Sequence, residues 1–201
     1  MFDAYVRPWI DAPLDAIAGR LAQANIRADV VTGLGLAIGL GGAVAVACNF
    51  YLTGLALFAT NRLLDGLDGA IARRTKLTDA GGYFDIAADF FVYAAYPLAF
   101  AWADPSRNAL AAAALLASFI ASGSTFLAFA SVAAKRGLTT TAQGHKSIYY
   151  LAGLAEGTET IIAFALMCLW PAQFAIIAAS FACLCAVSAI ARLFAGMKAL
   201  R

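Results

Sequence analysis

Four aspartates occur in two closely spaced pairs within a largely apolar part of the sequence. Asp65 and Asp68 are three residues apart, and Asp85 and Asp89 are four residues apart. On helices, each spacing places both carboxylates on one face. Because only a short basic segment around Arg73 separates the two pairs, the two helices should be antiparallel neighbours. We therefore expect the four carboxylates to converge near one end of the helices.

Such a group of acids predicts a site for divalent cations. Ionised carboxylates in a medium of low dielectric constant each cost several kcal/mol and repel one another. Mg²⁺ and Mn²⁺ prefer oxygen ligands, and two such ions can bind a diphosphate and stabilise the charge that moves between attacking and leaving oxygens. Arg73 adds a planar guanidinium suited to phosphate oxygens. The alternative is a structural polar cluster or acids in interfacial loops, which the matched spacing of the two pairs disfavours.

The elements that position these acids are predicted to be transmembrane helices. The 201 residues are 63% hydrophobic and 13% charged, and the mean hydropathy is +0.79, outside the range of soluble domains. About 20 apolar residues cross a bilayer as a helix. We predict an all-α integral membrane domain over residues 30–201, with six transmembrane helices at 30–48, 55–72, 81–102, 109–134, 148–170 and 174–190.

Residues 1–29 form a separate unit in this prediction. Aromatic and aliphatic residues alternate with charged ones at a spacing near the helical period, and Pro8 and Pro13 interrupt the pattern. We expect an N-terminal amphipathic segment that lies in the membrane interface. The alternative is a partly ordered tail.

The distribution of basic residues predicts the orientation in the membrane. With six spans, nearly all lysines and arginines fall on one side, and Arg107 alone lies on the other. Basic residues favour the cytoplasmic side, so we expect both termini and the aspartates there, at the inner or plasma membrane of a bacterium. The net charge of +2 gives no indication of a nucleic-acid partner.

The aspartate pattern resembles a known family signature. D-x-x-D-G-x-x-A-R, followed after seven residues by G-x-x-x-D-x-x-x-D, is similar to the motif of the CDP-alcohol phosphatidyltransferase family. The motif positions are filled by Asp65, Asp68, Gly69, Ala72, Arg73, Gly81, Asp85 and Asp89. The six-helix plan extends the resemblance over most of the chain.

The resemblance implies a membrane transferase of phospholipid synthesis, usually a homodimer, that moves a phosphatidyl group from CDP-diacylglycerol to a polar alcohol and releases CMP. It implies a two-metal centre of Mg²⁺ or Mn²⁺ at Asp65, Asp68 and Asp85, with Asp89 as a metal neighbour and catalytic base. It also implies contacts with the CDP moiety from Asp65, Gly69, Ala72, Arg73 and Thr32. A Pro-Asn-x-x-Thr stretch found in many members reads Ala-Asp-Val-Val-Thr at residues 28–32, so only Thr32 is kept.

Other polar residues within the predicted spans suggest an acceptor pocket. Arg62 lies three residues before Asp65 and should pair with Glu156 or Glu159, which brace the pocket or recognise the acceptor. Basic residues gather at the cytoplasmic ends of the later spans: Lys135, Arg136, Lys146 and Arg192. If they face the pocket, a phosphorylated alcohol such as glycerol 3-phosphate or inositol phosphate suits them. Otherwise they reflect topology and contact with anionic lipid.

Two other functions use similar residues. A membrane prenyltransferase binds a diphosphate through acidic helices, but that class has longer chains and two acidic motifs. A divalent-cation transporter lines its path with carboxylates, but transporters of this kind contain repeated halves. The sequence has one acidic cluster and no matching repeat, which favours the transferase.

Overall fold

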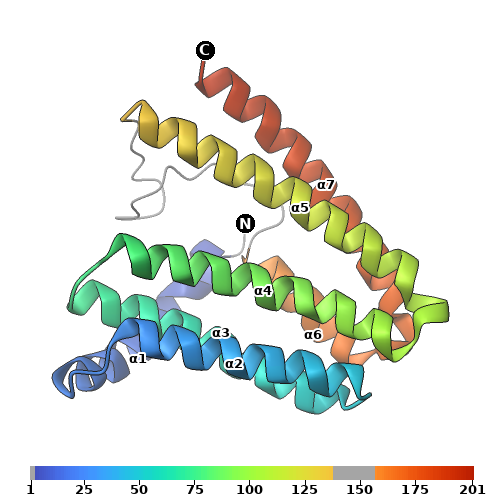
Figure 1. The fold of residues 1–201 in the computed structure, drawn as a ribbon, viewed down its shortest axis with the longest axis horizontal. Helices are drawn as coiled ribbons and strands as arrows, with labels where there is room; N and C mark the ends of the chain where they lie inside the picture. Colours follow the sequence, from blue (N-terminus) through green and yellow to red (C-terminus); the bar gives the residue numbers. More distant parts are fainter. Residues whose placement is uncertain (1–2, 138–156) are drawn as a thin grey trace.

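The computed structural model describes the backbone of residues 3–137 and 157–201, and this part of the chain is almost entirely helical (Figure 1). Its helices are α1 Asp3–Gln23, α2 Ala28–Ala47, α3 Tyr51–Arg74, α4 Asp79–Ala103, α5 Pro105–Lys135, α6 Gly157–Leu169 and α7 Phe174–Ala199, with a short 3₁₀ turn, η1, at Pro171–Gln173.

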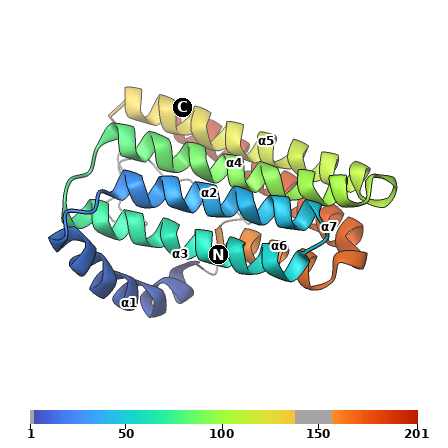
Figure 2. The same cartoon turned by 60° about the horizontal axis from the view of Figure 1, so that its bottom comes forward.

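Helices α2, α3 and α4 pack side by side, and α5 and α7 pack on each other next to α4. Helix α6 contacts both α3 and α7, so it links the two groups. Helix α1 lies across one end of α3, apart from the rest of the bundle (Figure 2). The loop from α3 to α4 and the start of α4 lie at that same end.

Glycines on α2 allow this helix to approach both of its neighbours. A Cβ atom at Gly39 would lie 2.7 Å from Val92 Cγ2 on α4 and 3.1 Å from the Asn61 side chain on α3. A Cβ atom at Gly42 would overlap the hydroxyl of Tyr96. Small residues let helix backbones come close in a membrane, where van der Waals packing drives association. The glycine face of α2 therefore determines how near α3 and α4 lie to each other.

A cluster of aromatic rings fills the core between the two groups of helices. The ring centroids of Phe58 and Tyr96 are 5.0 Å apart, and those of Tyr96 and Phe164 are 5.5 Å apart. Phe100 and Phe174 stack with centroids 4.4 Å apart. These five side chains are almost completely buried. The cluster joins α3, α4, α6 and α7. The polar residues of α3 and α4 lie towards the other end of these two helices.

The predicted spans are confirmed in part. By length and composition, four helices of the described residues can cross a membrane: α2, α4, α5 and α7 with its preceding turn. Helix α3 has 24 residues and runs beside α2, but its charged residues keep it outside that class. The predicted span 148–170 lies partly outside the described residues, within which α6 has 13 residues.

The N-terminal segment is helical, and α1 continues through Pro8 and Pro13, where an interruption of the pattern was predicted. Leu14, Ala18 and Leu21 share one face of α1, and they join a cluster with residues of α2 and α3. Contact with a neighbouring helix stabilises a helix despite its prolines. Its position in a membrane interface stays a prediction.

Candidate active site

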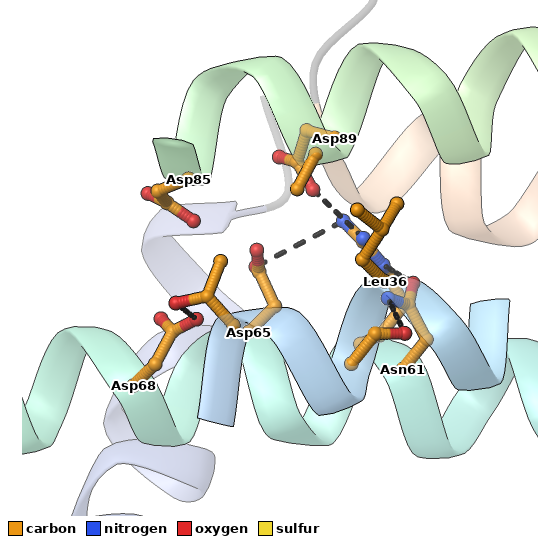
Figure 3. A pocket seen from close by; sticks show the side chains of 10 residues that line it. Leu36, Asn61, Asp65, Asp68, Asp85 and Asp89 are labelled. Atoms are coloured by element: carbon orange, nitrogen blue, oxygen red, sulfur yellow. Dashed lines mark hydrogen bonds and ion pairs between the residues drawn. The ribbon is translucent and has the colours of Figure 1, made fainter. Parts of the chain in front are cut away.

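One pocket lies between α2, α3 and α4, and its lining is polar on the α3 and α4 sides (Figure 3). The residues that line it are Thr32, Gly35 and Leu36 from α2, Asn61, Arg62, Asp65 and Asp68 from α3, and Asp85, Ala88 and Asp89 from α4. All four predicted aspartates are among them. The structure therefore brings together the two acidic pairs that sequence spacing predicted to converge.

The two helices present their acids from opposite walls. Asp65 and Asp68 point from α3 towards α4, and Asp85 and Asp89 lie on α4 opposite them (Figure 3). The start of α4 is fixed by a cap, since the Thr78 side chain accepts a hydrogen bond from the Gly81 backbone N–H at 3.0 Å. A side-chain cap of this kind stabilises a helix end by about 1 kcal/mol. The cap therefore stabilises the first turn of the helix that carries Asp85 and Asp89.

Asp68 is the most enclosed of the four acids, with 4% of the residue exposed. Thr32 Oγ1 donates a hydrogen bond to Asp68 Oδ2 at 2.6 Å, so α2 holds this carboxylate directly. Hydrogen bonds to an ionised acceptor are short and about twice as strong as neutral ones. Thr32 was predicted to contact a nucleotide, which stays a prediction; in the structure its hydroxyl contacts Asp68 within the pocket.

Arg62 is the basic residue among those that line the pocket. Its Nη2 atom donates to Asp89 Oδ1 at 2.7 Å, and its Nη1 atom lies 3.8 Å from Asp65 Oδ2. Arg62 therefore contacts Asp89 and Asp65, whereas a pair with Glu156 or Glu159 stays a prediction. Helix α2 packs against both α3 and α4, and this arrangement leaves Asp89 within reach of Arg62. Glu156 lies outside the described residues, and Glu159 is half-buried at the start of α6.

The donor set of the pocket suits an oxygen-binding divalent cation, because carboxylates outnumber the one guanidinium. As they stand, however, no three acidic, histidine or cysteine side chains of the described residues are grouped closely enough to hold a metal ion. Asp68 is turned towards Thr32, and Asp89 towards Arg62. The four predicted acids therefore line one pocket, and cation binding there stays a prediction.

Of the residues predicted to contact CDP, Thr32 lies on α2, and Gly69, Ala72 and Arg73 follow the acids on α3. Arg73 is exposed at the end of the helix, and Ala72 is half-buried beside it. A Cβ atom at Gly69 would lie 3.2 Å from Arg73 Nη1, so the guanidinium folds back over this glycine. The bare backbone of Gly69 leaves room there that a side chain would fill. This arrangement forms a basic rim one turn beyond Asp68.

Among the described residues predicted for the acceptor, Arg62 lines this pocket, whereas Lys135, Arg136, Glu159 and Arg192 do not. Lys135 and Arg136 are exposed at the end of α5, and Arg136 donates a hydrogen bond to the carbonyl oxygen of Leu200. Arg192 is 6% exposed. Its Nη1 atom donates to the hydroxyl of Ser122 at 3.1 Å and to the carbonyl oxygen of Ser122 at 3.2 Å. Lys146 lies outside the described residues. Arg192 thus faces inward, but towards α5.

Sequence reasoning missed two polar residues at the site. Asn61 lines the pocket, and Tyr93 accepts a hydrogen bond from Arg62 Nη1 at 2.9 Å. Asn61 lies four residues before Asp65, and Tyr93 four after Asp89, so both continue the polar face of their helix by one turn. Helical spacing from the known acids was the signal that could have identified them.

Comparison with other proteins gives a family and close relatives. A sequence model of the CDP-alcohol phosphatidyltransferase family matches residues 25–193. The inner membrane protein YnjF of Escherichia coli (strain K12) is 46% identical over 201 residues, which cover 100% of this chain and 98% of YnjF. Archaetidylinositol phosphate synthase of Methanothermobacter thermautotrophicus is 37% identical over 84 residues, 41% of this chain and 42% of that protein.

Solved structures show the same fold. The phosphatidylinositol phosphate synthase PgsA1 of Mycobacterium tuberculosis with CDP-DAG bound has a TM-score of 0.71 at 22% identity, covering 91% of this chain and 92% of that one. The same protein in complex with manganese and citrate has a TM-score of 0.72 at 22% identity, with 92% and 88% coverage. At this identity the likeness concerns the fold alone.

Proposed function

Because this integral membrane protein belongs to the CDP-alcohol phosphatidyltransferase family, we propose that it moves a phosphatidyl group from CDP-diacylglycerol to a small polar alcohol. CMP is the second product. The observation that carries the proposal is the single pocket between α2, α3 and α4 that all four motif aspartates line. Family membership supports the class of enzyme, a transferase of phospholipid synthesis, and the pocket supports the position of its site.

The α3 acids Asp65 and Asp68, together with Asp85 of α4, are proposed to hold two ions of Mg²⁺ or Mn²⁺. Ions at this position would offset the charge of the diphosphate and of the departing CMP. The excess of carboxylates over guanidinium in the pocket supports this role. Thr32 keeps Asp68 in place from α2. The remaining contribution of the protein is to position the two substrates, which is the main source of rate in phosphoryl transfer.

Asp89 is proposed as the base. The acceptor hydroxyl gives its proton to the Asp89 carboxylate while the hydroxyl oxygen forms a bond to the lipid-side phosphorus. The bond from that phosphorus to the CMP oxygen breaks, and CMP leaves with the electron pair. Asp89 lines the pocket together with the three proposed metal-binding acids, so a hydroxyl group that it contacts lies close to a phosphate held there.

The CDP moiety is proposed to bind near the end of α3, in contact with Asp65, Gly69, Ala72 and Arg73 of α3 and Thr32 of α2. The fold of Arg73 over Gly69 supports this placement, since a guanidinium at the rim binds phosphate oxygens in a planar geometry.

For the acceptor we propose a phosphorylated alcohol, such as glycerol 3-phosphate or inositol phosphate. The names of two similar proteins, archaetidylinositol phosphate synthase and phosphatidylinositol phosphate synthase, support this class. Its phosphate is proposed to bind basic residues of the later helices, namely Lys135, Arg136, Lys146 and Arg192, with a contribution from Glu156 or Glu159. We also propose a homodimer with both termini and the pocket on the cytoplasmic side.

The test is CMP release by purified protein in detergent with CDP-diacylglycerol, Mg²⁺ and a panel of alcohols that includes both phosphorylated candidates. Release should require an acceptor and a divalent cation. Asp89→Asn should bind CDP-diacylglycerol as the parent protein does but lose about 10²–10⁴-fold in turnover, the usual contribution of a general base. An Asp89→Asn protein with unchanged turnover would remove Asp89 from the base role, and no release with any alcohol would refute the transferase.

A further inference from the structure

Within the described residues, Asp89 is held in the pocket by a hydrogen bond from Arg62 of α3. We infer that Arg62 is a positioning residue for the proposed reaction, which keeps the Asp89 carboxylate at the α4 wall and apart from the acids of α3. The inference rests on the proposed function, because it assigns Arg62 to the step in which Asp89 receives the acceptor proton.

The guanidinium of Arg62 is fixed by hydrogen bonds from three of its nitrogens. Nη2 donates to Asp89 Oδ1 at 2.7 Å, Nη1 to Tyr93 Oη at 2.9 Å, and Nε to Asn61 Oδ1 at 2.8 Å. The planar fork of an arginine allows these contacts to form together, whereas a lysine ammonium is a single point of charge. Replacement by lysine keeps the charge but loses the geometry.

The surroundings of Arg62 further restrict its movement. The guanidinium carbon lies 5.0 Å from the ring centroid of Tyr93 and 5.7 Å from that of Phe58, and 9% of its side chain is exposed. Asn61 is itself held, because its Nδ2 donates to the Gly35 carbonyl oxygen of α2 at 2.9 Å. A continuous set of hydrogen bonds thus links α2, α3 and α4 and ends at Asp89.

The contacts of Arg62 with the carboxylates of the pocket differ in distance. It donates a hydrogen bond to Asp89, but its contact with Asp65 is an ion pair at 3.8 Å, beyond hydrogen-bond distance. Asp68 has Thr32 as its donor instead. The acid proposed as base is therefore the acid to which the arginine donates a hydrogen bond, while Asp68 is held by Thr32 and Asp65 has the longer contact with Arg62. This difference separates the role of Asp89 from that of the proposed metal ligands.

The first experiment measures kcat and KM for Arg62→Gln, Arg62→Lys, Asp89→Asn and the double variant Arg62→Gln/Asp89→Asn. Misplacement of a catalytic group by about 1 Å costs about 100-fold in rate, so Arg62→Gln should lose about 100-fold in kcat while KM for CDP-diacylglycerol stays within about threefold. Arg62→Lys should recover part of this loss. Arg107→Gln, which removes an arginine in the first turn of α5, outside the residues that line the pocket, is the matched control and should behave as the parent.

The double variant distinguishes positioning from general stabilisation. If Arg62 acts through Asp89, then Arg62→Gln should add less than about threefold to the loss already caused by Asp89→Asn, because residues that act as a unit are not additive. Independent effects would multiply instead, and that result would overturn the inference. Full activity of Arg62→Gln would overturn it as well.

A second readout does not depend on turnover. Mn²⁺ affinity, measured by electron paramagnetic resonance, should be unchanged or tighter in Arg62→Gln, because the substitution removes a positive charge and no proposed metal ligand. Loss of Mn²⁺ affinity together with a lower melting temperature in both Arg62 variants would assign Arg62 a structural role and overturn the inference. A parent protein that binds Mn²⁺ but releases no CMP would refute the proposed function instead.

Discussion

The substitution Gly39→Ala tests whether the close approach of α2 to its neighbours shapes the pocket. The new Cβ would lie 2.7 Å from Val92 Cγ2 and 3.1 Å from the Asn61 side chain, so α4, α3 or both must move. Asn61 donates a hydrogen bond to the Gly35 carbonyl oxygen and accepts one from Arg62. We therefore expect the substitution to lower stability and, through Asn61 and Arg62, turnover.

The magnitude follows from comparison with a second glycine on the same helix. Extra methyl groups in a packed interior cost about 1–3 kcal/mol, and replacement of glycine by alanine within a helix gains about 1 kcal/mol. Gly41→Ala should show only the gain in helix stability, because nothing lies within 4 Å of a Cβ atom there. The gain in helix stability is common to both variants and cancels when their free energies of unfolding are compared. Gly39→Ala should therefore be about 1–3 kcal/mol less stable than Gly41→Ala.

Thermal unfolding in detergent micelles, followed by tryptophan fluorescence, measures this difference, and CMP release measures the effect on turnover. Gly41→Ala should retain the turnover of the parent. If Gly39→Ala is as stable and as active as Gly41→Ala, then α2 does not set the spacing of α3 and α4, and the argument from its glycine face is wrong.

Three further predictions concern single side chains. Thr32→Val removes the donor to Asp68 and should lower stability by about 1.5–3 kcal/mol together with CMP release, while Thr32→Ser should retain both; equal loss in the two variants would contradict the hydrogen-bond argument. Arg192→Met should raise KM for a phosphorylated acceptor at least tenfold with KM for CDP-diacylglycerol unchanged, and a parental acceptor KM would remove Arg192 from the acceptor site. Asp104 caps α5, and the hydrogen bond from Ser106 holds the pKa of its carboxyl below the usual value. A depressed folded pKa contributes stability above the unfolded pKa of about 3.9 and loses it as pH falls through the folded value, so Asp104→Ala should lower the melting temperature at neutral pH but not in acid, with no change in turnover.

Much of the arrangement around the acids was predictable because it depends on local spacing. Hydrophobic runs predicted helices at 30–48 and 81–102, and the structure has α2 at Ala28–Ala47 and α4 at Asp79–Ala103. The spacing of three and four residues, with a short connection between the pairs, was sufficient to predict that the carboxylates share one pocket. These features follow from the helical period and from the length of a loop.

Features that depend on contacts between helices were not predictable in the same way. The spacing placed Arg62 on the face of Asp65, but its hydrogen bond with Asp89 depends on how α3 and α4 both pack on α2. The last helix was predicted to end at residue 190 and instead continues to Ala199, because hydropathy detects the part of a helix that suits a membrane and not the part beyond it. The helix predicted at 55–72 corresponds to α3, Tyr51–Arg74, although its charged residues keep it outside the class of apolar spans.

The central claim is that carboxylates of α3 and α4 act together on divalent cations, and the most direct measurement is the stoichiometry and affinity of Mn²⁺ binding by electron paramagnetic resonance. Asp85→Asn is compared with Asp79→Asn, which removes an exposed acid one and a half turns earlier on the same helix, outside the pocket. The account predicts two bound ions in the parent protein and in Asp79→Asn, and at least tenfold weaker binding in Asp85→Asn. Absence of Mn²⁺ binding in the parent, or equal affinities of the two variants, would contradict it.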